Sequence, residues 1–193
     1  MSSNLNKGWI MRSLITIIFF ISTLLANPNK DFTDKYCKFT DINDETLFLK
    51  LHKKPAYLLP NKDEIEAFLI KTIYPSQKIM PTLKSFKKDN LGNHYYRYNL
   101  LYKSLPLYFE EVLLQVDKNM RLVMVSGSAL IKLPIHANAE IKIKSAHLGW
   151  LRKEGVFYLV YKSHMKHQTV YIDAKSGKIL STFSDYQESS AKR

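Results

Sequence analysis

His164 and His167 are the side chains whose spacing comes closest to that of a metal-ligand pair in this sequence. Zinc peptidases of the His-Glu-x-x-His type use two histidines one helical turn apart, with a glutamate that activates the metal-bound water. The sequence contains no His-Glu-x-x-His. Residues 156–161 and 170–172 alternate on either side as paired strands do, so we predict a surface turn here and not a metal site.

The remaining polar residues offer no second kind of active site. The other histidines are dispersed, and neither a nucleophile elbow nor a glycine-rich phosphate loop is present. The acidic cluster at Asp41, Asp44 and Glu45 lacks the spacing of a calcium loop. The sequence therefore predicts a protein that is not an enzyme, with no catalytic residue, no cofactor and no metal ion.

The strongest helix signal begins at Asn61. Asn61 fits an N-cap, and the carboxylate of Glu64, three residues later, can reach back to the cap. Ile65, Phe68 and Leu69 then recur on one face. We expect an amphipathic helix that lays this apolar face on a sheet.

Beyond Pro81 the period of the apolar residues changes from near four to two, which is typical of strands. Three runs alternate in this way; they contain Tyr96, Tyr98 and Leu100, then Val112, Leu114 and Val116, then Leu122, Met124 and Ser126. Residues 117–120 join the last two runs as a tight turn. The pattern predicts an antiparallel sheet packed on the helix.

The order of these segments resembles that of the fungalysin/thermolysin propeptide (FTP) module over residues 61–130. The resemblance rests on residues 66–69, 91–92, 95–98, 102–107, 112–119 and 123–127. Residues 170–180, Val-Tyr-Ile-Asp-Ala-Lys-Ser-Gly-Lys-Ile-Leu, are similar to the closing hairpin of a PepSY domain, which follows the FTP module in precursors of thermolysin-like metallopeptidases. Each motif is hairpin chemistry found in many sheets, but the two stand in the family's order.

Five residues are candidates for partner binding. Arg97, Tyr102 and Pro106 agree with distinctive positions of the resembled family, and Tyr95 and Tyr108 are aromatics of the same strands. Exposed aromatics and strand edges can recruit a partner. The alternative for each tyrosine is that it packs sheet against helix.

Three departures from the family pattern fall at glycine positions, where this chain has Ser104, Glu110 and Met120. Because methionine avoids positive φ, we expect the turn at Met120 to be changed.

The resemblance implies an α+β fold of two small modules, each an antiparallel sheet packed against a helix. The expected parts are a signal peptide at 1–26, an N-terminal extension at 27–58, an FTP-like module at 59–132, a PepSY-like module at 133–184 and a polar tail at 185–193. In the second module, Ile135, Ala139, Ile143 and Ala146 fit one helical stripe, although Ile141 and Ile143 also fit a strand. A three-stranded sheet is expected to follow from Gly155 onward.

The N-terminus indicates export. Lys7 and Arg12 precede an apolar run at residues 14–26, which is typical of a signal peptide and short for a membrane span. We expect cleavage after Ala26, release to the periplasm or medium and no stable membrane span afterwards; an uncleaved, tethered form is the alternative. Cys37 is the only cysteine, so the chain has no internal disulfide.

The net charge of +12 falls to about +10 when Lys7 and Arg12 leave with residues 1–26, which hold no acid. Such a charge suits an acidic protein, a membrane surface or nucleic acid, and export argues against nucleic acid. The lysines are scattered, so a solvated surface and a basic face complementary to an acidic protease both remain open.

The resemblance implies a stand-alone propeptide-like protein that binds a thermolysin-like metallopeptidase as inhibitor or folding assistant. One alternative is a cell-envelope binding module without a protease partner. The other is a remnant of a metallopeptidase precursor that has lost its catalytic half.

Overall fold

The computed structural model describes residues 28–43, 45–75, 78–130 and 147–184. The expected signal peptide, the expected helix at 135–146 and the polar tail at 185–193 lie outside these residues. In the described part, neither α2 (Lys30–Tyr36) nor α3 (Lys62–Phe68) is long and apolar enough to cross a bilayer.

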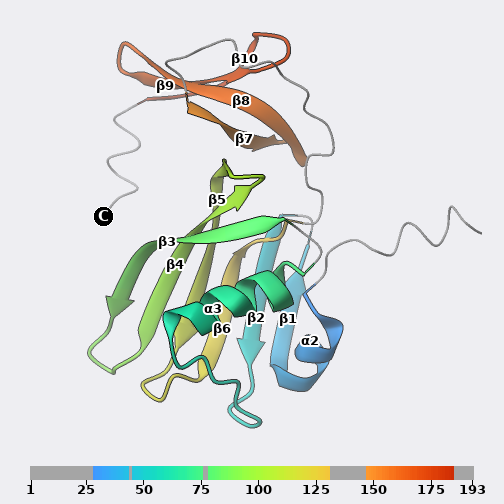
Figure 1. Ribbon diagram of the computed structural model, residues 1–193, viewed down its shortest axis with the longest axis vertical. Helices are drawn as coiled ribbons and strands as arrows, with labels where there is room; N and C mark the ends of the chain where they lie inside the picture. The colour runs from blue at the N-terminus through green and yellow to red at the C-terminus, as the bar shows by residue number, and fades with distance from the viewer. Residues whose placement is uncertain (1–27, 44, 76–77, 131–146, 185–193) are drawn as a thin grey trace, which may run out of the picture.

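The fold is α+β and mostly sheet (Figure 1). A first sheet has the strand order β1-β2-β6-β5-β4-β3, and a second has the order β7-β8-β9-β10. The strands are β1 (Cys37–Ile42), β2 (Thr46–Leu51), β3 (Ile79–Lys88), β4 (His94–Tyr102), β5 (Leu105–Val116), β6 (Leu122–Ser128), β7 (His147–Lys153), β8 (Val156–Met165), β9 (Gln168–Asp173) and β10 (Ile179–Ser184).

Helix α3 lies across one face of the first sheet, as predicted (Figure 1). The Asn61 side chain caps it by accepting a hydrogen bond from the backbone N–H of Glu64 at 3.0 Å. The helix continues as a π-helical turn, η1 (Leu69–Ile73). Ile65, Phe68 and Leu69 are buried in one core with the inward residues of the sheet, which include Leu49, Tyr98, Leu114 and Val125.

The turn between β5 and β6 corrects an expectation. Met120 adopts φ +59°, so the tight turn is kept and not changed. The Asp117 carboxylate accepts hydrogen bonds from the backbone N–H groups of Asn119 at 2.8 Å and Arg121 at 3.0 Å, and the Met120 N–H donates to the Asp117 carbonyl at 2.9 Å. These bonds and the packing of Met120 against the core outweigh the steric cost of the left-handed conformation.

The first sheet is larger than the sequence indicated. Residues set apart as an N-terminal extension form α2, β1 and β2, and β2 pairs with β6 from Thr46↔Ser128 to Lys50↔Met124. Strand β3 pairs along β4 and forms the opposite edge. The helix of this sheet is present; the helix expected for the second module falls on residues that are not described.

Strand β5 belongs to both sheets. Its second half pairs antiparallel with β4 and β6, and its Leu107 and Tyr108 pair in parallel with Trp150 and Leu151 of β7. Phe109, at φ +67°, marks the bend between the two parts. Strands β8, β9 and β10 match the expected three-stranded sheet, and β7 is the added strand that connects them to the first sheet.

Candidate partner-binding surface

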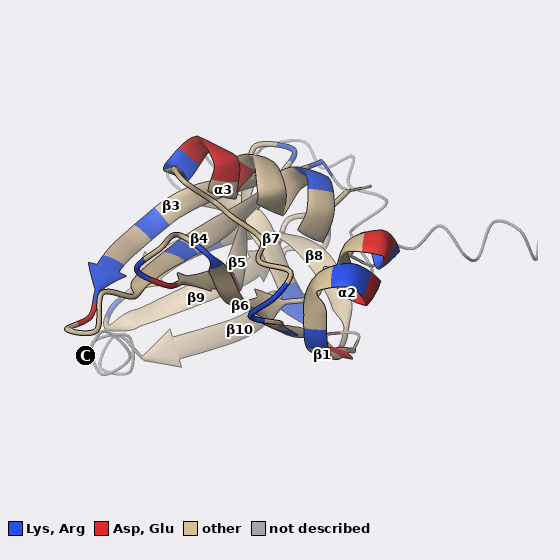
Figure 2. Cartoon of the chain, turned by 90° about the horizontal axis from the view of Figure 1, so that it is seen from below, with Lys and Arg blue, Asp and Glu red and all other residues tan. Residues whose placement is uncertain are grey.

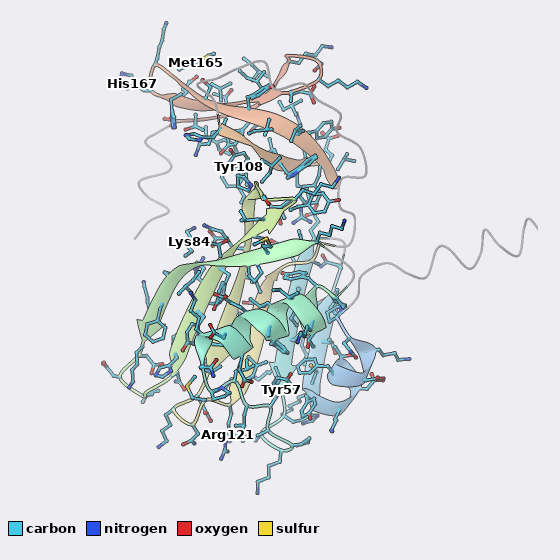
Figure 3. The ribbon with its side chains drawn as sticks, viewed as in Figure 1. Tyr57, Lys84, Tyr108, Arg121, Met165 and His167 are labelled. Carbon is cyan, nitrogen blue, oxygen red and sulfur yellow. The ribbon has the colours of Figure 1, made fainter. Side chains whose placement is uncertain are left out.

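The five candidate residues separate into two groups. Tyr95 and Arg97 lie on β4 and point to the face of the first sheet opposite α3, because they alternate with the buried Tyr98. Tyr102, Pro106 and Tyr108 lie where β4, β5 and β7 meet (Figure 3 labels Tyr108). The structure therefore does not gather the five into one site.

The Arg97 guanidinium belongs to a charged network on the face opposite α3. Its Nη1 donates to Glu111 Oε2 at 2.8 Å, and Lys84 of β3 pairs with the other carboxylate oxygen. Partial burial acts to raise the pKa of Glu111, but the bonds from Lys84 and Arg97 outweigh it and lower the pKa. Glu111 therefore stays ionised and holds two cations side by side on the sheet.

Tyr95 is tied to the neighbouring turn. Its hydroxyl donates to Asp89 Oδ2 at 3.0 Å and accepts from Gln115 Nε2 at 3.3 Å. The bond to Asp89 is the largest cause of the raised pKa of Tyr95. Asp89 also accepts from the backbone N–H groups of Leu91 and Asn93, so Tyr95 steadies this turn.

Tyr102, Pro106 and Tyr108 build the joint between the sheets. Trp150 Nε1 donates to the Tyr102 carbonyl at 3.3 Å, and the two rings lie 5.8 Å apart. The Tyr108 hydroxyl donates to the His147 carbonyl at 3.0 Å, and burial raises the Tyr108 pKa to about 12. A Cβ at Gly149 would lie 2.5 Å from the Tyr108 ring, so only glycine admits this packing. These contacts are structural.

Glu110 and Arg152 complete the joint, and the sequence did not single them out as a pair. The buried Glu110 carboxylate takes two hydrogen bonds from Arg152, from Nε at 2.8 Å and from Nη2 at 2.5 Å. Arg152 also donates to the carbonyls of Ala129 and Glu45. In the sequence, Glu110 was notable only because it replaces a glycine of the resembled family. No pattern of neighbouring residues indicates that its partner, Arg152, lies on a distant strand.

The surface that remains for a partner is the face of the first sheet opposite α3, which we call the open face. Its residues, given by strand pairing and alternation, include Phe39, Phe48, Lys50, Lys84, Tyr95, Arg97, Glu111, Leu113 and Met124. Phe39 is 53% exposed and its ring lies 6.0 Å from that of Phe48. The open face thus combines apolar side chains with cations, in contrast to the mostly apolar face under α3.

His164 and His167 do not lie one turn apart on a helix. His164 is the second-to-last residue of β8 and contacts the Thr169 hydroxyl through Nδ1 at 3.2 Å, whereas His167 lies in the predicted turn (Figure 3). Among the described residues, no three His, Cys, Asp or Glu side chains gather as a metal site.

Comparisons with known proteins give no family. No family model matches the sequence, and no curated protein matches it. Among solved structures, the chain is similar to the Bacillus megaterium YpeB C-terminal domain, with a TM-score of 0.35 and 9% sequence identity over 94% of this chain and 99% of that chain. A likeness this distant carries no argument about function.

Proposed function

We propose that this chain is an exported protein-binding module that contacts a thermolysin-like zinc peptidase through the open face, as inhibitor or folding assistant. The observation that carries the proposal is the asymmetry of the first sheet. Helix α3 and η1 cover one face, and the open face presents exposed Phe39 beside cations. The sequence resemblance to FTP and PepSY modules supplies the class of partner.

The chemistry of the open face suits an acidic protein. Aromatic anchors supply buried area at low entropic cost, and arginine is enriched at interfaces because its guanidinium bonds in several directions. Glu111 engages Nη1 of Arg97, so other N–H donors of the guanidinium remain available to a partner. The net charge of about +10 on the mature chain favours the approach of an acidic surface.

Inhibition on this proposal is occlusion. The proposed contact is spread over a sheet face. Affinity should therefore depend on several open-face side chains and not on a single ligand to the zinc.

The test compares two phenylalanines with matched exposure on opposite faces. Phe39 is 53% exposed on the open face, and Phe86 is 51% exposed on the side of α3. Mature chains of residues 27–193 carrying Phe39→Ala or Phe86→Ala are titrated against thermolysin in a peptidase assay and by calorimetry. We expect Phe39→Ala to weaken binding by about tenfold or more, in the range of an interface anchor, and Phe86→Ala to leave it unchanged.

Equal effects of the two substitutions, or no binding by the unaltered chain, would overturn the proposal. A pull-down from the source's secreted fraction then separates the alternatives. Capture of envelope components would favour the envelope-module alternative, and capture of nothing would favour the remnant.

A further inference from the structure

The described sheets have three edge strands, and two of them are protected against pairing with another chain. β3 carries Pro81, a bulge after Leu83 and lysines at 84, 87 and 88. β1 carries Lys38, Asp41 and a bulge after Cys37. Prolines, bulges and charged side chains are the devices by which proteins prevent edge pairing.

The third edge, β10, has no such protection along most of its length. Its sequence, Ile-Leu-Ser-Thr-Phe-Ser, contains no charge and no proline, and Figure 2 shows it without a charged position. It pairs with β9 in regular register from Ser181 to Ser184, after one bulge at Leu180. Ile179 and Thr182 are exposed. Among the described strands only β9 pairs with β10, which leaves the other side of β10 unpaired within the described residues.

An aromatic cluster lies directly beside this edge. Phe183 of β10 is 5.1 Å from the Phe109 ring and 5.7 Å from the Tyr171 ring. Phe109 is exposed and holds a positive φ, which is an outlier for a bulky residue. A strand added to β10 would place a side chain opposite Phe183, where an apolar or β-branched group gains cross-strand contact.

Lysines lie at the start of the same edge. Lys175 and Lys178 are exposed in the turn that leads into β10, and Lys153 Nζ donates to the Leu180 carbonyl at 3.0 Å. This charge favours an incoming segment that bears carboxylates. It disfavours a second copy of the chain, because two mature chains, each with a net charge of about +10, repel each other.

We propose that β10 accepts an extended, acidic segment of another protein as an additional strand. Backbone hydrogen bonds to β10 provide affinity, Phe183 and Phe109 select an apolar side chain, and the lysines select a carboxylate. The inference goes beyond the proposed function, since strand addition at β10 does not require that the open face bind a peptidase.

The test is selection from a phage-displayed library of random heptapeptides on the mature chain, residues 27–193. We expect enriched peptides to alternate β-branched or aromatic residues and to carry Asp or Glu. Their affinity should fall at least tenfold on Ile179→Glu, which adds a charged side chain to the β10 edge and repels the carboxylates of the peptide. Met80→Glu is the matched control, because Met80 is 56% exposed on β3 and Ile179 is 60% exposed. Binding to this control should be unchanged.

Hydrogen exchange gives an independent readout that a general loss of structure would not mimic. An enriched peptide should slow exchange of the amides of residues 179–184 on the unaltered chain. Failure to enrich any peptide, enriched peptides whose affinity does not change on Ile179→Glu, or no slowing at β10 would each overturn the proposal. A dimer that Ile179→Glu dissociates would also overturn it, because a second copy would then be the occupant. Peptide binding at β10 without thermolysin binding would refute the proposed function alone.

Discussion

Left-handed backbone at residues other than glycine is the most unusual feature at the residue scale. The chain has only six glycines, and several of its tight turns use other residues at positive φ. Lys103 and Ser104, at φ 50° and 64°, form the two-residue turn between β4 and β5. Glu154 and Gly155, at 53° and 74°, form the equivalent turn between β7 and β8. Such turns favour glycine at the second position.

The two turns predict opposite effects of exchanging serine and glycine. Ser104→Gly should raise the free energy of unfolding by about 1 kcal/mol, because glycine removes the steric cost of positive φ. Gly155→Ser should lower it by about the same amount, since a Cβ there meets no atom within 4 Å and only the backbone is strained. Urea denaturation of both variants measures the effects. Changes of the same sign would contradict the turn assignment.

Cys37 should react slowly with alkylating reagents. Burial raises the pKa of its thiol to about 11 from 9.0. A shift of two units leaves about a hundredfold less thiolate at pH 8, so iodoacetamide should modify the folded chain about a hundredfold more slowly than the chain in urea. The rate should rise with pH up to about 11. Equal rates in the folded and unfolded chains would show that the thiol is exposed.

At the scale of elements, the sequence predicted what local pattern determines. The cap at Asn61, the apolar face of α3 and the alternation of β4, β5 and β6 are properties of neighbouring residues, and these elements are present. Strand β7 and the role of β2 depend on pairing with distant strands, which no local period reveals. Alternation also predicts on which face of the sheet a side chain lies, but it does not predict which element covers that face.

The candidate residues show the same limit. Arg97 lies on the open face, as the alternation of side chains along β4 predicts. Tyr102 and Tyr108 are engaged by Trp150 and His147, which the sequence places far away. The prediction of a changed turn at Met120 was wrong for another reason. Hydrogen bonds to Asp117 compensate for the unfavourable positive φ of the methionine.

The joint between the sheets should be sensitive to losing one ionic partner. Arg152→Leu leaves the buried Glu110 carboxylate without its guanidinium and should cost about 3 kcal/mol of stability. The double variant Glu110→Leu/Arg152→Leu should recover much of that loss, because no buried charge remains. The exposed pair provides the control, since Arg97→Leu should cost less than about 1 kcal/mol. A double variant as unstable as the single one would contradict this account.

At the scale of the whole molecule, the two proposed contacts lie on different parts of the fold. The open face belongs to the first sheet, and β10 is the far edge of the second sheet (Figure 1). Lysine and arginine are spread over several elements, with repeated positions along β3 (Figure 2). The charge thus attracts an acidic partner generally, and the apolar side chains at each contact provide the specificity.

Removal of the C-terminal tail should leave peptidase binding intact. Occlusion by the open face does not use residues 185–193, so a chain ending at Ser184 should bind thermolysin within about twofold of the full mature chain. Inhibition assays and calorimetry on the truncated chain measure this. Loss of all binding on truncation would refute occlusion by the open face.

The membership of β5 in both sheets has a thermodynamic consequence. Trp150 and Phe157 of the second sheet are buried in the same core as Leu107 and Val112 of β5, so the core of the first sheet continues into the second. The molecule should therefore melt in one cooperative transition. By linkage, a strand bound at β10 and a partner bound on the open face each stabilise the folded state. Because β5 connects the two sheets, either ligand should raise the melting temperature of both.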